Sequence, residues 1–329
     1  MRKIFYFIFI SYCVILTSCK DYMNMNLNPY TETKNENIET KNENIVCSNG
    51  ELTVYTNKGG MLYSMFKQKY ADGNGTEELG TEEWNYVKSI VITGVIDARD
   101  FSTIKWNFRN VEYIDISNTK IIAYEGEYGT NEGYYEKYDE DTIPFGAFFY
   151  WTNHVLRGYE KKLPDEMLCR GLRKLKEIKL PNGIKMIDDN AFRWCDSLEN
   201  VNIPEGVIEI GPAAFRRCES MKTITLPSTL KIVGHPDGGV FTDMYSLKEV
   251  HMHCKEIPIG FYVFGDMIDM WNYEMFNTNF RPSEYFCYVS DDESCYHRMT
   301  NATLFVPKGY KNNFNEWCIH FNNIVEEDV

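Results

Sequence analysis

Apolar and polar positions recur along the middle of the chain with a period of 23 residues. Residues 175–197 read LKEIKLPNGIKMIDDNAFRWCDS, and residues 198–220 read LENVNIPEGVIEIGPAAFRRCES. A third unit, residues 221–246, contains three additional residues, and a fourth opens at residue 247 and runs to residue 267. A fixed period of this length indicates a repeat architecture, in which each unit is one small supersecondary element stacked on its neighbours.

Each unit predicts a short strand, a turn and a return segment. The opening L-x-x-I-x-L alternates apolar and polar residues, as expected of a strand with one buried face. A proline then ends the strand, because it cannot donate a ladder hydrogen bond; it is present as Pro181, Pro204 and Pro227. The A-F-x-x-C segment on the return side predicts a single helical turn packed beneath the strand. Strands stacked about 4.8 Å apart would bury a continuous core.

The cysteine of the return segment stands where later units carry methionine. Cys195 and Cys218 hold this position in the first two units, and Met244 and Met267 hold it in the later ones. The exchange favours buried thiols, because the position accepts a soft apolar group. A disulfide between the two cysteines is the alternative, since stacked turns could bring their Cα atoms near bonding range. The state of the outer cysteines stays open, with a Cys287–Cys295 bridge as one option: Cys287, Cys295 and Cys318.

Weaker copies of the pattern flank the regular units. Ile90–Ile92 and Ile114–Ile116 predict two strands, and residues 143–148, with IP followed by AF, predict a degenerate unit. Near the C-terminus, TLFVPKGYKNNF and FNNIVE resemble the C-terminal cap of the repeat family described in the next paragraph. Two insertions interrupt the array: residues 124–141 are acidic and contain five tyrosines, and residues 268–301 are rich in aromatic residues.

The consensus of these units, LxxIxLPxxLxxIxxxAFxxCxxL, resembles the BspA-type leucine-rich repeat, which is common on bacterial surface proteins. The resemblance is close over residues 175–220, looser through residue 264, and extends in weaker form over residues 50–326. It implies a leucine-rich-repeat solenoid, that is, a right-handed, β-rich α/β superhelix. The repeats would be about 23 residues long, with irregular N-terminal turns before them and a C-terminal cap after them.

The N-terminus has the pattern of a targeting signal. Arg2 and Lys3 precede an apolar run over residues 4–15. As a helix this run would span about 18 Å, too short for a bilayer core of about 30 Å and typical of a signal peptide. Residues 16–19 read LTSC and resemble the lipobox of bacterial lipoproteins. The resemblance implies cleavage before Cys19 and lipidation of that cysteine, and an ordinary secretory signal is the alternative.

The predicted organisation therefore has six parts. Residues 1–18 form a lipoprotein signal peptide, and residues 19–46 form a lipid-anchored flexible tether in which ETKNENI occurs twice. Residues 47–174 form the irregular N-terminal turns with the acidic Tyr-rich insertion, and residues 175–267 form the regular repeats. The aromatic insertion covers residues 268–301, and the cap covers residues 302–329.

Composition narrows the range of partners. The chain has 329 residues, with 34 Lys and Arg against 48 Asp and Glu and a formal net charge of −14. No cluster of Lys or Arg is present to contact phosphates, which argues against nucleic acid as a partner. Hydrophobic residues make up 43% of the chain, enough for a sizeable core. Only one long apolar run exists, which argues against a multispanning membrane protein.

No motif points to catalysis, a metal or another cofactor. The sequence contains no CxxC, HExxH, GxSxG or P-loop pattern, so we expect neither an enzyme nor a cofactor site. His251 and His253 would share one strand face, but no third ligand is visible in the sequence, which favours solvated strand residues over a zinc site. The acidic residues 139–141 do not fit an EF-hand calcium loop and are expected to be solvated.

The candidate binding residues lie on two kinds of surface. Strand alternation places a polar stripe on the outward face of the repeat strands: Glu177, Lys179, Asn200, Asn202, Thr223, Thr225, Glu249 and His251. The insertions offer aromatic side chains, which give large contact areas at interfaces: Tyr134, Tyr135, Trp271, Tyr273 and Tyr285. The alternatives are a solvated sheet surface and aromatic residues that cover an end of the repeat array.

Together with the resemblance, these features predict a cell-surface lipoprotein that binds macromolecules. It would act as an adhesin or recognition module for host-matrix or cell-surface proteins. It would be held at the outer membrane by its lipid anchor and face the cell surface. A glycan-binding lipoprotein and a periplasmic scaffold without an external ligand are the alternatives.

Overall fold

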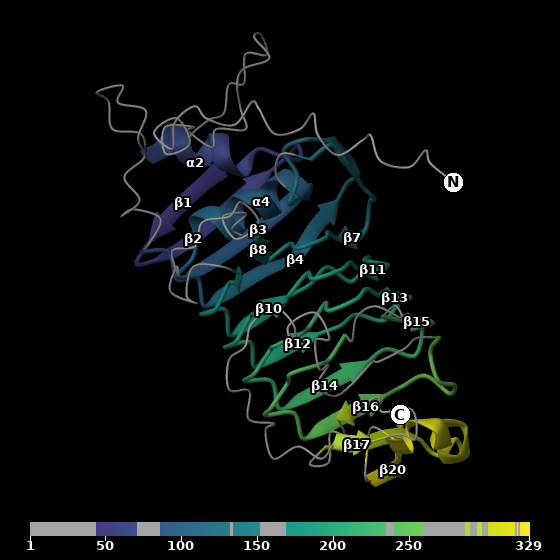
Figure 1. Ribbon diagram of the computed structural model, residues 1–329. Coiled ribbons are helices and arrows are strands. Elements are labelled where there is room, and N and C mark those ends of the chain that lie inside the picture. The colour runs from purple at the N-terminus through teal and green to yellow at the C-terminus, as the bar shows by residue number, and fades with distance from the viewer. Residues whose placement is uncertain are drawn as a thin grey trace, which may run out of the picture. The chain divides into compact units, whose positions relative to one another are not determined.

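Strands of successive segments lie side by side in chain order (Figure 1). The computed structural model describes these residues: 44–70, 86–131, 134–151, 169–234, 240–259, 287–289, 295–297, 302–319, 321 and 323–329. All of them belong to the unit Thr40–Val329. The signal peptide, Cys19 and most of the predicted tether lie outside the described residues. Among those described, no helix has the length and apolar character needed to cross a membrane.

The first sheet contains the N-terminal turns and the first two regular repeats. Its order is β1-β2-β3-β4-β10-β12, and every pair is parallel except β1–β2. The strands are β1 (Ile45–Ser48), β2 (Glu51–Thr56), β3 (Ser89–Ile96), β4 (Tyr113–Ile121), β10 (Glu177–Lys179) and β12 (Asn200–Asn202). The two strands predicted around Ile90–Ile92 and Ile114–Ile116 are confirmed as parts of β3 and β4.

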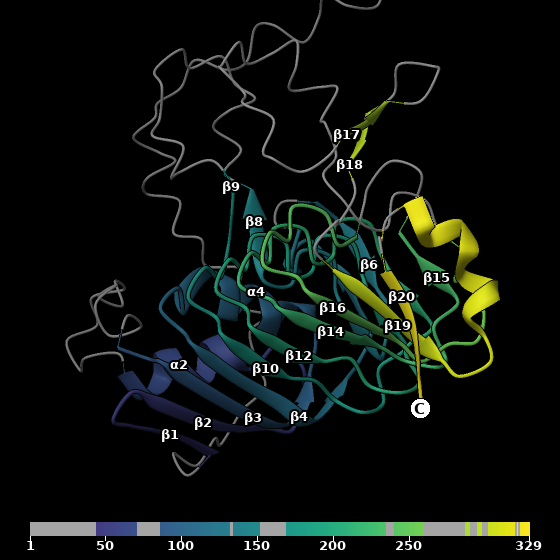
Figure 2. The same cartoon turned by 90° about the horizontal axis from the view of Figure 1, so that it is seen from below.

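The second sheet continues the series beyond β12, which lies next to β14 (Figure 1). Its order is β14-β16-β19-β20, all parallel. The strands are β14 (Thr223–Leu226), β16 (Glu249–Met252), β19 (Thr303–Pro307) and β20 (Asn323–Glu327). A 3-10 helix, η4 (Lys311–Ile319), connects the last two strands and lies beside β20 (Figure 2). The two segments expected to form the C-terminal cap contain these last two strands, β19 and β20.

A third, parallel sheet contains one two-residue strand from the degenerate unit and one from each of the first three regular repeats. Its order is β15-β13-β11-β7; the strands are β7 (Thr142–Ile143), β11 (Met186–Ile187), β13 (Glu209–Ile210) and β15 (Ile232–Val233). The register pairs Ile143 with Ile187, so the degenerate unit at residues 143–148 is confirmed as a neighbour of the first regular repeat. The sequence pattern did not single out this sheet, because strands of two residues carry no alternation.

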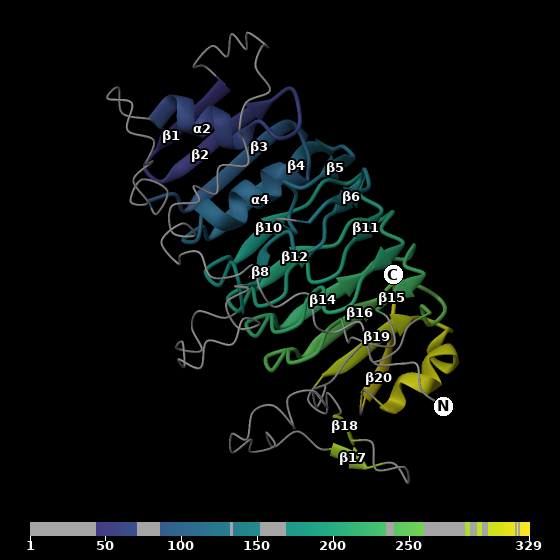
Figure 3. The same ribbon diagram turned by 45° about the horizontal axis from the view of Figure 1, so that its top comes forward.

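In the part of the chain that the structure describes, the remaining elements are two helices and three antiparallel strand pairs, which we call hairpins. Helices α2 (Leu62–Tyr70) and α4 (Ala98–Asn107) lie against the same side of the N-terminal strands (Figure 3). Their buried residues, such as Phe66 and Phe101, join one continuous core with the strands. The hairpins are β5–β6 (Tyr124–Gly126 and Glu136–Tyr138), β8–β9 (Phe149–Trp151 and Cys169–Gly171) and β17–β18 (Cys287–Val289 and Cys295–His297).

A row of stacked phenylalanines forms the centre of the core. Phe148, Phe192, Phe215 and Phe241 are all fully buried. Their ring centroids are separated by 5.0, 5.0 and 5.6 Å along the row, and the rings are nearly parallel. Each ring comes from the same position of successive units, so the repeat period of the sequence becomes a continuous aromatic stack. Burying one such side chain contributes about 2–3 kcal/mol.

The return segments are not the helical turns predicted from A-F-x-x-C. Residues 188–195 form successive tight turns, with left-handed φ angles of 57° at Asn190 and 62° at Trp194. The turns direct every second N–H to the neighbouring repeat, as Asn190 to Pro212, Phe192 to Ala214 and Trp194 to Arg216. A helix would have kept these hydrogen bonds inside one repeat. The turn conformation is favoured over a helical turn because its N–H groups form hydrogen bonds that join adjacent units.

The folded part begins slightly earlier than predicted. Strand β1 starts at Ile45, two residues inside the expected tether 19–46. Ile45 is 3% exposed and belongs to the core, and it pairs with Val54 on β2. The apolar residue at the end of the second ETKNENI copy therefore packs into the folded unit.

Candidate recognition surfaces

The predicted polar stripe lies on the outward side of the sheets. Alternation buries Ile178, Val201, Ile224 and Val250 and turns their neighbours outward. Six of the predicted side chains are exposed and two, Thr225 and His251, are half-buried. Parallel pairing aligns them across strands, as Glu177 with Asn200, Lys179 with Asn202, Thr223 with Glu249 and Thr225 with His251. The placement of all eight is confirmed, and their role in binding stays a prediction.

Next to β10, strand β4 adds a compact polar cluster to this face. Register places Tyr113 beside Glu177 and Asp115 beside Lys179. The Asp115 carboxylate accepts hydrogen bonds from Tyr113 Oη at 3.1 Å and from Ser117 N and Oγ at 3.0 and 2.6 Å. Lys179 Nζ lies 3.8 Å from Asp115 Oδ2 and 5.4 Å from the centre of the Tyr113 ring. Partial burial alone would raise the pKa of Asp115, but these donors and the lysine hold it below its ordinary value.

The C-terminal part of the face carries an aromatic cluster. The His251 ring on β16 stacks on Phe305 of β19 with a centroid distance of 4.6 Å and an interplanar angle of 8°. Its Nδ1 lies 2.9 Å from Glu327 Oε2 on β20, and its Nε2 lies 3.6 Å from Glu249 Oε2. The imidazole therefore connects the last regular strand to the cap across an intervening strand.

The two histidines, His251 and His253, contact different carboxylates. His253 lies beyond the end of β16, and its Nδ1 is 3.9 Å from Glu205 Oε1, far from the carboxylates around His251. Among the residues whose placement is described, no three His, Cys, Asp or Glu side chains are grouped as metal ligands. The alternation predicted for this stretch is confirmed, because Met252 and Cys254 are buried.

The two predicted tyrosines of the acidic insertion are exposed on hairpin β5–β6. Tyr134 is 57% exposed and Tyr135 is 66% exposed. Tyr135 Oη donates a hydrogen bond to Glu125 Oε1 at 2.9 Å, and this contact raises the pKa of Tyr135. The aromatic residues predicted in the second insertion lie outside the described residues: Trp271, Tyr273 and Tyr285.

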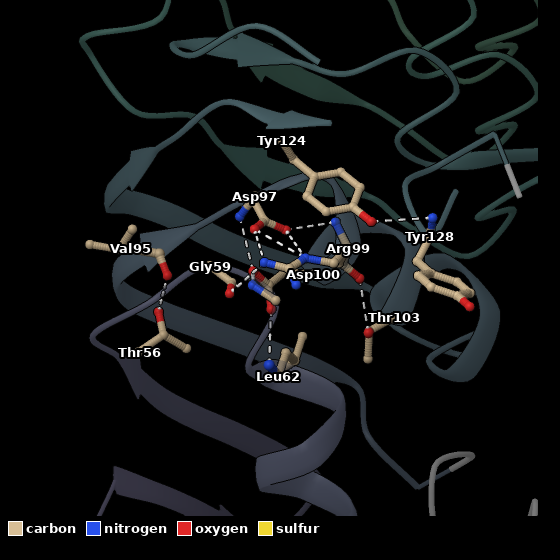
Figure 4. Close-up of polar contacts among 11 residues, drawn as sticks. Thr56, Gly59, Leu62, Val95, Asp97, Arg99, Asp100, Thr103, Tyr124 and Tyr128 are labelled. Carbon is tan, nitrogen blue, oxygen red and sulfur yellow. Dashed lines mark hydrogen bonds and ion pairs between the residues drawn. The ribbon is translucent and has the colours of Figure 1, made fainter. Parts of the chain in front are cut away.

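A buried polar network anchors this region to the helices (Figure 4). Arg99 Nη2 pairs with Asp97 Oδ2 at 2.6 Å and donates to Gly59 O at 3.0 Å. The guanidinium also lies 4.6 Å from the centre of the Tyr124 ring, at the base of the hairpin. Asp97 is the N-cap of α4 and forms a capping box with Asp100. One arginine thus links the loop before α2, the start of α4 and the hairpin.

Asp100 is the most deeply buried acidic residue of this network. It is 0% exposed and accepts backbone hydrogen bonds from Gly60 at 2.6 Å, Leu62 at 2.9 Å and Asp97 at 2.9 Å. One carboxyl group therefore caps the N-termini of both α2 and α4. Burial, reinforced by the negative charge of Asp97, raises the pKa of Asp100 to about 7, although the three N–H groups oppose this shift.

The comparison with known families identifies the repeats. Residues 163–288 match, in six copies, the family described as the BspA type leucine rich repeat region. These repeats are of the BspA type. Repeats of this family imply protein–protein or surface recognition in general, and they are typically binding modules rather than enzymes. The resemblance predicted from the sequence is confirmed, and the fold is a repeat fold with parallel sheets.

Three solved structures show some likeness to this chain. A leucine-rich repeat protein of T. pallidum, TpLRR, is 14% identical with a TM-score of 0.32, over 68% of this chain and 78% of its own. The pneumococcal vaccine antigen PcpA is 14% identical with a TM-score of 0.33, over 74% and 63%. A leucine-rich repeat protein from Bacteroides ovatus is 17% identical with a TM-score of 0.24, over 65% and 60%. No curated protein matches the chain.

The cysteines of the BspA-type repeats are unreactive by environment. Cys195 and Cys218 are fully buried free thiols, as favoured by the sequence. Their Sγ atoms face the carbonyl oxygens of Phe148 and Phe192, and burial raises the pKa of both thiols well above the ordinary value. Burial likewise raises the pKa of Cys254 to about 12. The backbones of Cys287 and Cys295 lie in hairpin β17–β18, and their side chains are outside the description.

Sequence reasoning missed four residues that complete the outward face of the strands. Tyr113 and Asp115 extend the stripe on its N-terminal side, and Phe305 and Glu327 extend it on the C-terminal side. The same alternation in YIDIS and TLFVP could have found the first three, had it been carried into the irregular turns and the cap. Glu327 had no such signal, because its role depends on where β20 docks.

Proposed function

We propose that this chain is a lipid-anchored, surface-exposed recognition module that binds a protein partner through the outward face of its repeat strands. The stacked units would form a right-handed solenoid with that face as its binding side. The partner would be a host-matrix or cell-surface protein, so that the module acts as an adhesin.

The arrangement of side chains on the face carries this proposal. Ionic and aromatic groups gather at two places, Tyr113–Asp115–Lys179 and His251–Phe305–Glu327. Between them, β12 and β14 present only uncharged Asn and Thr side chains in the predicted stripe. The strands from β4 to β19 would extend over about 24 Å at the usual strand spacing. A face of this length, with anchors at both ends, fits a macromolecule better than a small metabolite.

The anchors have the character of interface hot spots. Tyrosine and stacked aromatic rings supply rigid contact area, and charged groups around them orient a partner. Asp115 and Lys179 are already held in place by their mutual contact and by Ser117. Binding would therefore immobilise few additional side chains, which lowers its entropic cost.

Binding can be tested with two pairs of substitutions matched in residue type. Lys179→Ala with Asn202→Ala removes the lysine of the N-terminal anchor and its neighbour on β12. Lys185→Ala with Asn182→Ala removes the same two residue types from exposed positions off the strands. Binding of the mature protein to plated collagen and laminin would be measured for both variants. We expect a loss of about tenfold or more for the first pair and little change for the second. Equal behaviour of the two pairs, or no binding to any plated protein, would overturn the proposal.

The anchor and the location need a separate experiment. Intact cells would be treated with protease, and released peptides from residues 47–329 would be identified by mass spectrometry. Release from unbroken cells supports surface exposure, and Cys19→Ser should abolish incorporation of a labelled fatty acid. Protection until the outer membrane is breached would contradict the adhesin role and leave a periplasmic scaffold.

A glycan partner is the second candidate, because the Tyr113 ring lies beside a carboxylate and a lysine on an open sheet face. Titration of the same two double variants with soluble polysaccharides would distinguish a glycan partner from a protein partner. Binding of a glycan that depends on Lys179 and Asn202, with no binding to plated proteins, would replace the protein-binding proposal.

A further inference from the structure

Hairpin β5–β6 presents a second surface, separate from the outward face of the repeat strands. Its chain segment, residues 124–141, contains seven acidic residues and a single lysine. Three of its five tyrosines are exposed, namely Tyr128 at 43%, Tyr134 at 57% and Tyr135 at 66%. We propose that this Tyr-rich hairpin docks an extended, Lys- or Arg-rich segment of a partner protein.

The inner side of the hairpin is fixed by aromatic packing. Tyr138 is 6% exposed, and its Oη accepts a hydrogen bond from Asn131 N at 2.9 Å. The Tyr124 ring stacks on Tyr138 at 6.1 Å and also faces the Arg99 guanidinium at 4.6 Å. Tyr124 Oη accepts a hydrogen bond from Tyr128 N at 3.3 Å (Figure 4). These contacts hold the backbone that carries the outer tyrosines.

A buried lysine fixes the tip side of the hairpin. Lys105 on α4 is 2% exposed, and its ammonium group donates to the carbonyl oxygen of Thr130. It also donates to Gly146 O at 3.3 Å and Phe149 O at 3.2 Å. Gly129 packs directly against the Tyr138 ring, where a Cβ atom would have no space. The exposed tyrosines therefore project from a preorganised support, which lowers the entropy lost on binding.

The exposed carboxylates on the outer side of the hairpin favour a positively charged partner. Glu125 and Glu127 are exposed on one side of the hairpin, and Asp139 and Glu140 are exposed where it rejoins the chain. Lys137 Nζ lies 3.7 Å from Asp139 Oδ1 and offsets only one of the seven acidic residues of this segment. The hairpin therefore has a strongly negative net charge. Tyrosine faces attract guanidinium and ammonium groups, and nearby carboxylates add to that attraction. The same kind of contact already occurs at the base of this hairpin, between Tyr124 and Arg99 of α4.

Other partners fit these observations less well. A polyanion would be repelled by the carboxylates, and a neutral glycan would leave most of them unused. A basic peptide uses both features at once, the rings through cation–π contacts and the acids through ion pairs. The Glu125 carboxylate is moreover oriented by Tyr135 Oη at 2.9 Å, so that ring and charge act at the same place.

The test uses the mature protein and a fluorescent 12-residue peptide that alternates Arg and Ser, with a Glu-Ser peptide of the same length as a control. Anisotropy would be measured at about 0.15 M salt, where weak long-range attraction is screened. Tyr134→Ala with Tyr135→Ala removes the outer rings without changing charge. Tyr55→Ala with Tyr86→Ala is the matched control, because both of those tyrosines are exposed away from the hairpin.

We expect the Arg-Ser peptide to bind and the hairpin pair to weaken it about tenfold, with less than about a twofold change in the control pair. Tyr134→Phe with Tyr135→Phe should restore most of the affinity, since the ring faces remain. Glu125→Gln with Glu127→Gln should weaken binding more than Glu177→Gln with Glu249→Gln, which removes the same charge from the sheet face.

Three results would overturn the proposal. They are no binding of the Arg-Ser peptide, equal losses in the two tyrosine pairs, and equal losses in the two glutamate pairs, which would indicate attraction by net charge alone. Circular dichroism of each variant would verify that the fold is retained. Because none of the hairpin substitutions touches the repeat strands, failure here leaves the proposed function of the sheet face standing, and the reverse also holds.

Discussion

Asp100 on α4 accepts a hydrogen bond at 2.9 Å from the backbone N–H of Leu62, the first residue of α2. The same carboxyl group closes the capping box of its own helix through Asp97 N. Two helices that are far apart in the chain thus share one buried acidic group. Its ionisation couples the packing of the N-terminal turns to pH.

The first prediction concerns that coupling. The pKa of Asp100 rises from 3.8 to about 7 on folding because burial and Asp97 disfavour the charged form. Between about pH 4 and pH 7 the folded protein therefore retains a proton that the unfolded chain releases, so stability falls as pH rises through this window and levels off above it. The shift corresponds to at most about 4 kcal/mol. Urea unfolding at pH 5 and pH 8 would measure the difference.

Asp100→Asn should remove most of this pH dependence, whereas Asp139→Asn at an exposed position should leave it unchanged. A smaller slope in the same direction should remain from Asp188, whose pKa is also raised by burial. Asp115 does not interfere, because its lowered pKa places its own contribution below this pH range. The idea fails if stability rises with pH between 5 and 8, or if Asp100→Asn keeps the full slope.

The second prediction tests the aromatic stack. Phe215 lies between Phe192 and Phe241 with both neighbours nearly parallel to it, and it is fully buried. Phe215→Ala should lower the free energy of unfolding by about 3–5 kcal/mol, because it removes buried surface and leaves a cavity. Phe305→Ala on the outward face should cost much less, since that ring is only half-buried. Similar losses at the two positions in denaturant titrations would contradict a core built on this stack.

The alternation of apolar and polar residues predicted the strands of the regular repeats. Alternation within each strand determines which side chain is buried, so Ile178 and Val201 were placed inside and Lys179 and Asn202 outside. The aromatic position followed from the same register. The turn conformation of the return segment was predicted wrongly, because its N–H groups bond to the next repeat rather than within one.

Contacts between distant segments could not be predicted in this way. The hydrogen bond from Leu62 N to Asp100 joins residues 38 positions apart in the sequence. The contact between His251 and Glu327 joins residues 76 positions apart. Neither pair shares a strand, a helix face or a repeat position. Such contacts depend on how the N-terminal helices and the C-terminal cap dock, which hydrophobic periodicity does not specify.

The third prediction concerns the docking of the cap. His251 and Glu327 are 2.9 Å apart, with side-chain exposures of 23% and 25%. A double-mutant cycle with His251→Ala and Glu327→Ala should give a coupling energy of about 1 kcal/mol or less, as expected for a partly exposed pair. The cycle with Glu249→Ala should give less, because that carboxylate is 3.6 Å away and 50% exposed. A larger coupling to Glu249 would show that the cap is not held by Glu327.

The last prediction concerns Lys105, which supports the Tyr-rich hairpin from below. Its ammonium group donates to three backbone carbonyls from two loops. Lys105→Met keeps the length of the side chain but leaves those buried carbonyls without this donor, so we expect a loss of stability of about 2–3 kcal/mol. Amide hydrogen exchange should increase at residues 128–131 and 146–149 before it increases in the repeat strands.

As a control, Lys137→Met on the exposed side of the same hairpin should leave both stability and exchange nearly unchanged. Unchanged exchange at the two loops in Lys105→Met would show that the hairpin is held by its aromatic packing alone.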